Sequence, residues 1–148
     1  MPFWEDLAFG KSGEHIAWLD LLESPKTKQV LDVRFDPYFK EKDIDFLQLD
    51  FENNVNKIEV KADRRAHETG NIAFETKSKT TEGCLARSEA DYIYYYIEKT
   101  NEVLILRVDA LKGYIKYKDP KEIPMGDNAR GYLLNIQDLI DYKVAVRR

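Results

Sequence analysis

The sequence predicts a mixed α/β fold, in which helices flank a central sheet. Three observations lead to this class: a helical pattern comes first, several strand patterns follow close together, and helical and strand patterns then occur again. The 148 residues suit one domain, and the 43% hydrophobic content is enough for that domain to form a core. We therefore expect residues 1–148 to fold as a single domain.

The first half of the chain is expected to form one helix and four strands. An apolar face over residues 5–23 predicts the helix, and Pro25 marks its end because the residue before a proline avoids helical angles. Gly70 is expected at positive φ in the polar loop 64–70. Alternating apolar and polar residues predict strands at 29–35, 43–49, 57–63 and 72–77.

The second half of the chain is expected to alternate between helices and strands. Ser88 is a candidate N-cap and favours a helix over 88–97, although the run of tyrosines there is also typical of a strand. The continuous apolar run at 102–108 predicts a strand covered on both sides. The remaining expectations are loops at 78–87 and 120–131, a short helix at 109–116, a last strand at 132–136, and a turn or short helix at 137–142.

Composition narrows the class of protein. The net charge of −4 argues against a uniformly basic nucleic-acid binder, but it is compatible with a local basic strip. The single cysteine allows no internal disulfide, and there is no Cys/His array for structural zinc. Neither a signal peptide nor a membrane-spanning run is apparent, so we expect a soluble cytoplasmic protein without a membrane partner.

The candidate chemistry lies in the second and third predicted strands. Alternation places Glu59, Lys61 and Asp63 on one side of the third strand, and a hairpin would bring Asp45 of the second strand close to Glu59. Two carboxylates and a backbone carbonyl make a hard-oxygen site that suits Mg²⁺. Such an ion lowers the pKa of bound water and stabilises a phosphoryl transition state, while Lys61 would orient the water or neutralise charge.

This arrangement resembles the PD-(D/E)XK nuclease superfamily, which includes restriction endonucleases, Holliday junction resolvases and many phage or mobile-element nucleases. The family core combines an acid on one strand, a (D/E)-x-K on the next strand and an acid in a preceding helix. Asp45, the Glu59 and Lys61 pair, and Glu14 match these positions. The resemblance spans roughly residues 10–97, including the expected helix at 88–97. It implies a restriction-endonuclease-like fold and Mg²⁺- or Mn²⁺-dependent hydrolysis of DNA phosphodiester bonds.

The resemblance also implies a role for each matched residue. Asp45, Glu59 and the Val60 carbonyl would bind the metal ion, and Glu14 would bind it directly or through water. Lys61 would assist the nucleophile. Three further residues, which follow the third strand, are candidates for contact with DNA phosphates: Arg64, Arg65 and His67.

Several assignments stay open at this point. Asp43 is a rival to Asp45 as the metal ligand, and Ile44 stands where many members of the family have proline. Glu75 has no role that the general motif fixes. Each feature also has a plainer explanation: Glu-x-Lys as a solvated ion pair, Glu14 as an acid that favours the start of a helix, and the paired arginines as a solvated turn.

We therefore expect a small metal-dependent DNA endonuclease. Its short chain leaves little room for a separate specificity domain, which favours a structured or nonspecific DNA substrate, or dependence on a partner or a homodimer. The alternative is a catalytically inactive nuclease-fold protein that acts as a nucleic-acid-binding or protein-interaction module. A third, weaker alternative is a structural subunit with no nucleic-acid role.

Overall fold

The computed structural model describes residues 3–63, 66–78, 81–82, 88–125 and 128–148. Six strands form sheet A in the spatial order β1 (Thr27–Asp32), β2 (Phe46–Asp50), β3 (Val55–Asp63), β6 (Tyr92–Ile97), β7 (Glu102–Arg107) and β10 (Ala145–Arg147). Within sheet A, β3 and β6 pair in parallel and the other neighbours pair antiparallel. This mixed sheet with flanking helices confirms the predicted fold class.

A second sheet was not predicted. Sheet B has four antiparallel strands in the order β5 (Thr81–Glu82), β4 (Asn71–Ser78), β9 (Arg130–Asn135) and β8 (Ile123–Pro124). The helices are α1 (Phe3–Glu23), α2 (Pro37–Lys40), α3 (Ala66–Thr69), α5 (Val108–Lys118) and α6 (Ile136–Asp141). In the described ranges, no helix is both long enough and apolar enough to cross a membrane.

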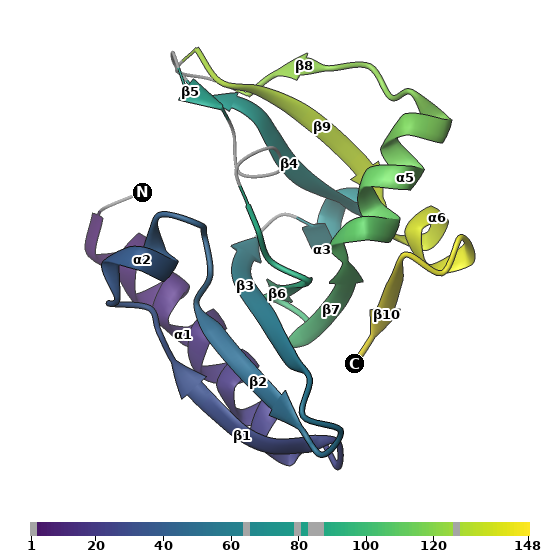
Figure 1. Ribbon diagram of the computed structural model, residues 1–148. Coiled ribbons are helices and arrows are strands. Elements are labelled where there is room, and N and C mark those ends of the chain that lie inside the picture. The colour runs from purple at the N-terminus through teal and green to yellow at the C-terminus, as the bar shows by residue number, and fades with distance from the viewer. Residues whose placement is uncertain (1–2, 64–65, 79–80, 83–87, 126–127) are drawn as a thin grey trace.

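The two faces of sheet A are covered by different layers (Figure 1). One face packs against α1, through a cluster that includes Ala17, Leu21, Phe46 and Ile58. The opposite face packs against sheet B, α5 and α6. This second cluster contains, among others, Ile93, Leu104 and Leu106 of sheet A, Ile72, Phe74 and Leu134 of sheet B, and Leu111 and Leu139 of the two helices. Sheet A is therefore the middle layer of the molecule.

Helix α1 approaches sheet A closely at Gly13. A Cβ atom at this position would lie 3.3 Å from the Cβ of Ala62 and 3.3 Å from a ring carbon of Tyr96, which is tighter than ordinary van der Waals contact. Glycine therefore allows the helix axis to come close to β3 and β6. The next residue is Glu14, so this close approach also brings the predicted helical acid near the sheet.

The expected helix at 88–97 is wrong, because residues 92–97 form the central strand β6. Successive side chains of β6 enter the two different cores: Tyr94 and Tyr96 join the cluster beneath α1, while Ile93 and Ile97 join the opposite cluster. A strand buried on both faces accommodates aromatic and β-branched residues at every position. Tertiary burial therefore decides between the two structures that the sequence pattern allowed.

A hydrogen-bonded joint connects the two sheets at Tyr95. Its hydroxyl donates to Oδ2 of Asp63 in β3 at 3.0 Å and accepts from the backbone N–H of Ala73 in β4 at 3.3 Å. Asp63 also accepts from the N–H of Ala66 at 2.9 Å, which satisfies a donor in the first turn of α3. These contacts give Asp63 a structural role.

The remaining differences lie at strand boundaries. Strand β2 begins at Phe46, so Asp43 and Asp45 precede it, and Asp43 has a positive φ of 58°. Gly70 has a φ of 72°, as predicted. Three strands were missed: β5, inside the expected loop 78–87, β8, inside the expected loop 120–131, and β10, after the expected last strand.

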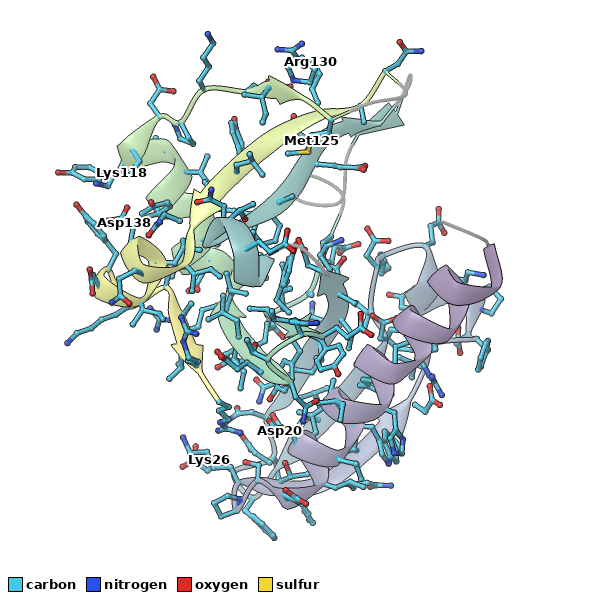
Figure 2. All side chains as sticks on the ribbon, turned by 180° about the vertical axis from the view of Figure 1, so that it is seen from behind. Asp20, Lys26, Lys118, Met125, Arg130 and Asp138 are labelled. Atoms are coloured by element: carbon cyan, nitrogen blue, oxygen red, sulfur yellow. The ribbon has the colours of Figure 1, made fainter. Side chains whose placement is uncertain are left out.

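Polar contacts hold α5 and α6 together at the other side of the molecule. Lys118 of α5 lies beside Asp138 of α6 in Figure 2, with Nζ and Oδ2 3.7 Å apart. The hydroxyl of Tyr114 in α5 donates to the same carboxylate of Asp138. Lys118 is thus engaged with a neighbouring helix.

Candidate active site

Asp45 directly precedes β2, at the point where the chain enters that strand beside β3. Its N–H donates to the carbonyl of Ile58 at 2.8 Å, and its carbonyl accepts from the N–H of Val33 at 3.0 Å. The register of β2 and β3 places Phe46 opposite Ile58 and therefore brings Asp45 next to Glu59. The predicted hairpin and the predicted approach of these two acids are both present.

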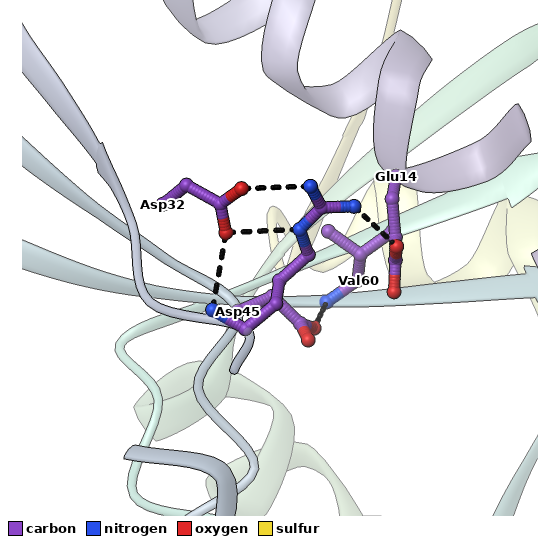
Figure 3. Close-up of polar contacts among 5 residues, drawn as sticks. Glu14, Asp32, Asp45 and Val60 are labelled. Carbon is purple, nitrogen blue, oxygen red and sulfur yellow. Dashed lines mark hydrogen bonds and ion pairs between the residues drawn. The ribbon is translucent and has the colours of Figure 1, made fainter. Parts of the chain in front are cut away.

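The Asp45 carboxylate forms a hydrogen bond with the backbone of β3. Its Oδ2 accepts the N–H of Val60 at 2.7 Å (Figure 3). Because the N–H and C=O of one strand residue point to the same side, the Val60 carbonyl faces the edge where Asp45 lies. Burial raises the pKa of Asp45 to about 7, and the charges of Glu14 and Glu59 act in the same direction. The N–H of Val60 and the charge of Lys61 oppose this rise.

Glu59 is a buried acid, with only 5% of its surface exposed. Its Oε2 accepts from the hydroxyl of Ser88 at 2.7 Å, and its Oε1 lies 3.3 Å from Nζ of Lys61. Burial raises the pKa of Glu59, and the nearby charge of Asp43 contributes to this rise. Lys61 and Ser88 favour the ionised form. These partners thus fix the position of the carboxylate, while burial disfavours its ionised form.

Ser88 was not predicted as part of the site. It is 4% exposed, and its hydroxyl also accepts from the N–H of Ala90 at 3.2 Å. The sequence suggested Ser88 as a helix cap, which is the other common use of a serine that bonds to a backbone N–H two residues away. Only the parallel pairing of β3 and β6 reveals its contact with Glu59.

Glu14 reaches the same neighbourhood from α1, but an arginine holds it. Oε2 of Glu14 lies 2.7 Å from Nη1 of Arg34. Arg34 also donates to both carboxylate oxygens of Asp32, from Nη2 at 2.7 Å and from Nε at 2.9 Å. The bond with Arg34 lowers the pKa of Asp32, and the bonds with Asp32 and Glu14 raise the pKa of Arg34 above its usual range. The sequence pattern placed Arg34 only within the strand expected at 29–35 and gave it no role in the site.

The structure therefore brings Asp45, Glu59, Lys61 and Val60 together, with Glu14 close enough to affect the pKa of Asp45. The residues that the structure describes contain no group of three His, Cys, Asp or Glu side chains arranged to hold a metal ion. Glu59 projects from the face of β3 opposite the α1 core, whereas Glu14 belongs to α1 and is paired with Arg34. The two glutamates thus approach Asp45 from different sides.

The predicted DNA-contact residues lie largely outside the described part of the chain. Arg64 and Arg65 lie outside the described residues, and His67 lies in α3 with a side chain that is also not described. Glu75 lies in β4 of sheet B, where it is exposed and pairs across the ladder with Gly131. The proposed contacts of Arg64, Arg65 and His67 with DNA stay predictions.

The architecture has a counterpart among solved structures. It is similar to a bacterial homing endonuclease, I-Ssp6803I. The TM-score is 0.51, the sequence identity is 20%, and the match covers 72% of this chain and 72% of that chain. At this identity the similarity establishes a shared fold. The chain matches no protein-family model and no curated protein.

Proposed function

We propose that this protein is a metal-dependent DNA endonuclease of the PD-(D/E)XK type, which hydrolyses phosphodiester bonds with Mg²⁺ or Mn²⁺. The observation that carries the proposal is the pair of adjacent carboxylates, Asp45 and Glu59, whose pKa values are both raised by burial. Shared fold with a homing endonuclease supports the same conclusion. Perturbed acids clustered in this way are typical of catalytic sites, where such shifts are useful.

The pair of acids fits a divalent cation. Burying two neighbouring carboxylates costs free energy when both are ionised, and a bound cation offsets that cost. Carboxylate and carbonyl oxygens are ligands that Mg²⁺ accepts, with water completing its shell. Asp45, Glu59 and the Val60 carbonyl would hold the ion, and Glu14 would join them directly or through water. The ion, when bound, would lower the pKa of water and stabilise charge on phosphorus-bound oxygens.

Lys61 is the proposed assistant of the nucleophile. Its amine lies 3.3 Å from Glu59 and influences the pKa of both acids. A cationic group in this position can orient a water molecule or neutralise charge that develops during hydrolysis. Asp63, two residues further along the same face, is engaged with Tyr95 and Ala66 and is therefore not assigned to the chemistry.

The proposed substrate is DNA, contacted through its phosphates. Arg64, Arg65 and His67 follow β3 directly and remain the proposed phosphate contacts. One active site cleaves one strand in a single event, so two copies would allow both strands to be cut in one encounter. We therefore include a homodimer in the proposal, with a structured or nonspecific DNA substrate.

The test is nicking of supercoiled plasmid and of branched DNA in the presence of Mg²⁺ or Mn²⁺. We expect activity in the wild type and its loss in Asp45→Asn and Glu59→Gln, which keep the shape of each side chain. Glu102→Gln is a matched control, because Glu102 is a paired acid in β7, bonded to Arg147 and outside the site. Activity that persists in both site variants would overturn the assignment.

A second candidate function is supported by the state of Glu14. Its pairing with Arg34, and the lack of a three-ligand group among the residues described, favour a nuclease-fold module that binds nucleic acid or protein without catalysis. Calorimetric titration with Mn²⁺ separates the two functions. Heat of binding that disappears in Asp45→Asn supports the nuclease, whereas a DNA mobility shift without any Mn²⁺ binding supports the module.

A further inference from the structure

Arg34 pairs with Glu14, the helical acid of the candidate site, although nothing in the motif assigns a role to Arg34. We propose that Arg34 is a positioning residue that withholds Glu14 from the cation and releases it when a substrate phosphate binds the guanidinium. The proposal rests on the proposed nuclease function. It begins from the contact between Arg34 Nη1 and Glu14 Oε2 at 2.7 Å, which joins the β1 side of the site to α1.

Arg34 is anchored independently of Glu14. The Asp32 carboxylate accepts hydrogen bonds from Nε of Arg34 at 2.9 Å and from Nη2 at 2.7 Å. This is the bidentate geometry that arginine makes with a carboxylate. The guanidinium carbon also lies 5.5 Å from the ring centre of Phe46, the residue that directly follows Asp45. The guanidinium would therefore stay beside the site, with its charge still paired, after Glu14 had left.

The contact with Glu14 is the separable one. It uses a single nitrogen of Arg34 and a single oxygen of Glu14, and both side chains are partly exposed, at 27% and 29%. Figure 3 shows Glu14 on α1 and Asp32 on the opposite side of this contact, with Asp45 and Val60 beside them. One glutamate thus lies between two positive partners, the guanidinium in this structure and the cation of the proposed site.

Charge explains why the two partners exclude each other. A carboxylate oxygen that accepts a charge-assisted hydrogen bond is less available to a metal ion, and a guanidinium nearby repels a divalent cation. Phosphate is the other group that matches the planar fork of arginine. A DNA phosphate that reaches Arg34 would replace Glu14 as its partner and free the glutamate for the cation.

The first experiment measures Mn²⁺ affinity calorimetrically on the full-length protein without DNA. We expect Arg34→Met to bind Mn²⁺ about tenfold more tightly than the wild type, within the usual range of coupling between sites. The gain should disappear when Glu14→Gln is combined with Arg34→Met, because the released glutamate is its cause. Arg34→Lys keeps the charge without the fork and should give a smaller gain.

Arg148→Met is the matched control. Arg148 makes a 2.8 Å ion pair with Asp20, which lies on α1 as Glu14 does (Figure 2), and this control should leave Mn²⁺ affinity unchanged. An unchanged affinity in Arg34→Met would overturn the proposal. The same gain in the Glu14→Gln background would also overturn it, because that result is a general charge effect. Mn²⁺ binding that is insensitive to Asp45→Asn would instead contradict the proposed function.

The second experiment tests the phosphate contact. Affinity for a short DNA duplex is measured against salt concentration in EDTA, where cleavage cannot occur. Arg34→Met should reduce the slope of log affinity against log salt by about one, as expected when a single phosphate contact is lost. Arg148→Met should keep the wild-type slope. A slope that does not change in Arg34→Met would show that the guanidinium meets no phosphate.

Discussion

Glu59 and Asp63 project from the same face of β3, four residues apart, yet the structure treats their carboxylates very differently. Asp63 accepts from the hydroxyl of Tyr95 and from the N–H of Ala66 in α3, and the same hydroxyl of Tyr95 connects it to Ala73 of sheet B. Glu59 is buried next to Asp45, and the pKa values of both are raised. Strand β3 therefore carries Asp63, which stabilises the fold, and Glu59, whose ionised form is disfavoured by burial. The comparison shows that the donors around a carboxylate, rather than its place in a motif, determine its role.

The largest expected effect is on cleavage. Asp45→Asn keeps the hydrogen-bonding shape of the side chain but removes the charge that would hold the cation, which contributes several kcal/mol to hydrolysis. We expect the rate of Mg²⁺-dependent plasmid nicking to fall at least about 1,000-fold. Asp63→Asn should reduce the rate only in proportion to the fraction that unfolds. Equal losses in folded samples of the two variants would remove the distinction between the two ends of β3.

The second effect is on stability and pH in the presence of EDTA. The pKa of Asp45 rises from an ordinary 3.8 to about 7 on folding, so the folded protein binds the proton more strongly than the unfolded chain. The stabilising contribution is complete below pH 4 and is lost as the pH rises through 7. Each unit between the two pKa values corresponds to about 1.4 kcal/mol, so the loss is at most about 4 kcal/mol, reduced by solvent screening.

Urea unfolding between pH 4 and pH 8 measures this contribution. The wild type should lose stability across the interval more steeply than Asp45→Asn, in which the titrating group is absent. Asp63→Asn should keep the steep dependence of the wild type. Identical pH profiles for the wild type and Asp45→Asn would contradict the raised pKa of Asp45.

The strand pattern alone was enough to predict the central part of the site. Alternation placed Glu59 and Lys61 on the opposite side of the strand from Ile58 and Val60. The short connection between the two strands predicted that Glu59 would lie close to Asp45. Both predictions are local, because they need only the period of a strand and the length of a turn. The placement of Glu14 near Asp45 depended on the family resemblance, since no local pattern joins residues 31 positions apart in sequence.

The unpredicted parts depend on contacts between distant segments. Sheet B requires Gly131 to pass close to β4, where a Cβ atom would lie 2.2 Å from the carbonyl oxygen of Phe74. A strand pattern in the sequence does not show which strands will pair. The role of Ser88 follows from β6 lying beside β3, and the role of Arg34 follows from α1 crossing sheet A. Both side chains look like ordinary polar residues until the tertiary structure is known.

The third effect concerns the joint between the sheets. Tyr95→Phe removes a hydroxyl bonded to the carboxylate of Asp63 and should lower the free energy of unfolding by about 2 kcal/mol. Tyr96→Phe is the matched control, because its hydroxyl bonds to the neutral side chain of Asn101 at 3.1 Å. It should cost about 1 kcal/mol. Thermal unfolding measures both values, and Mn²⁺ affinity should not change in either variant.

The smallest expected effect on stability comes from Ser88→Ala. Glu59 loses a donor at 2.7 Å but keeps Lys61, whose Nζ lies 3.3 Å from its Oε1, so the free energy of unfolding should fall by only about 1 kcal/mol. Mn²⁺ affinity should nevertheless fall about tenfold, because a group that orients a metal ligand affects the metal more than the fold. This is the reverse of the pattern expected for Tyr95→Phe. An unaltered Mn²⁺ affinity in Ser88→Ala would show that Glu59 does not need this hydrogen bond to bind the ion.

The most direct measurement is anomalous diffraction from a crystal of the protein soaked in Mn²⁺. The proposed function predicts one strong Mn²⁺ peak in contact with the carboxylates of Asp45 and Glu59 and with the carbonyl of Val60. The proposed role of Arg34 further predicts that Glu14 stays bound to Arg34 in the absence of DNA. A crystal that takes up Mn²⁺ elsewhere, with none between Asp45 and Glu59, would contradict the assignment of this site.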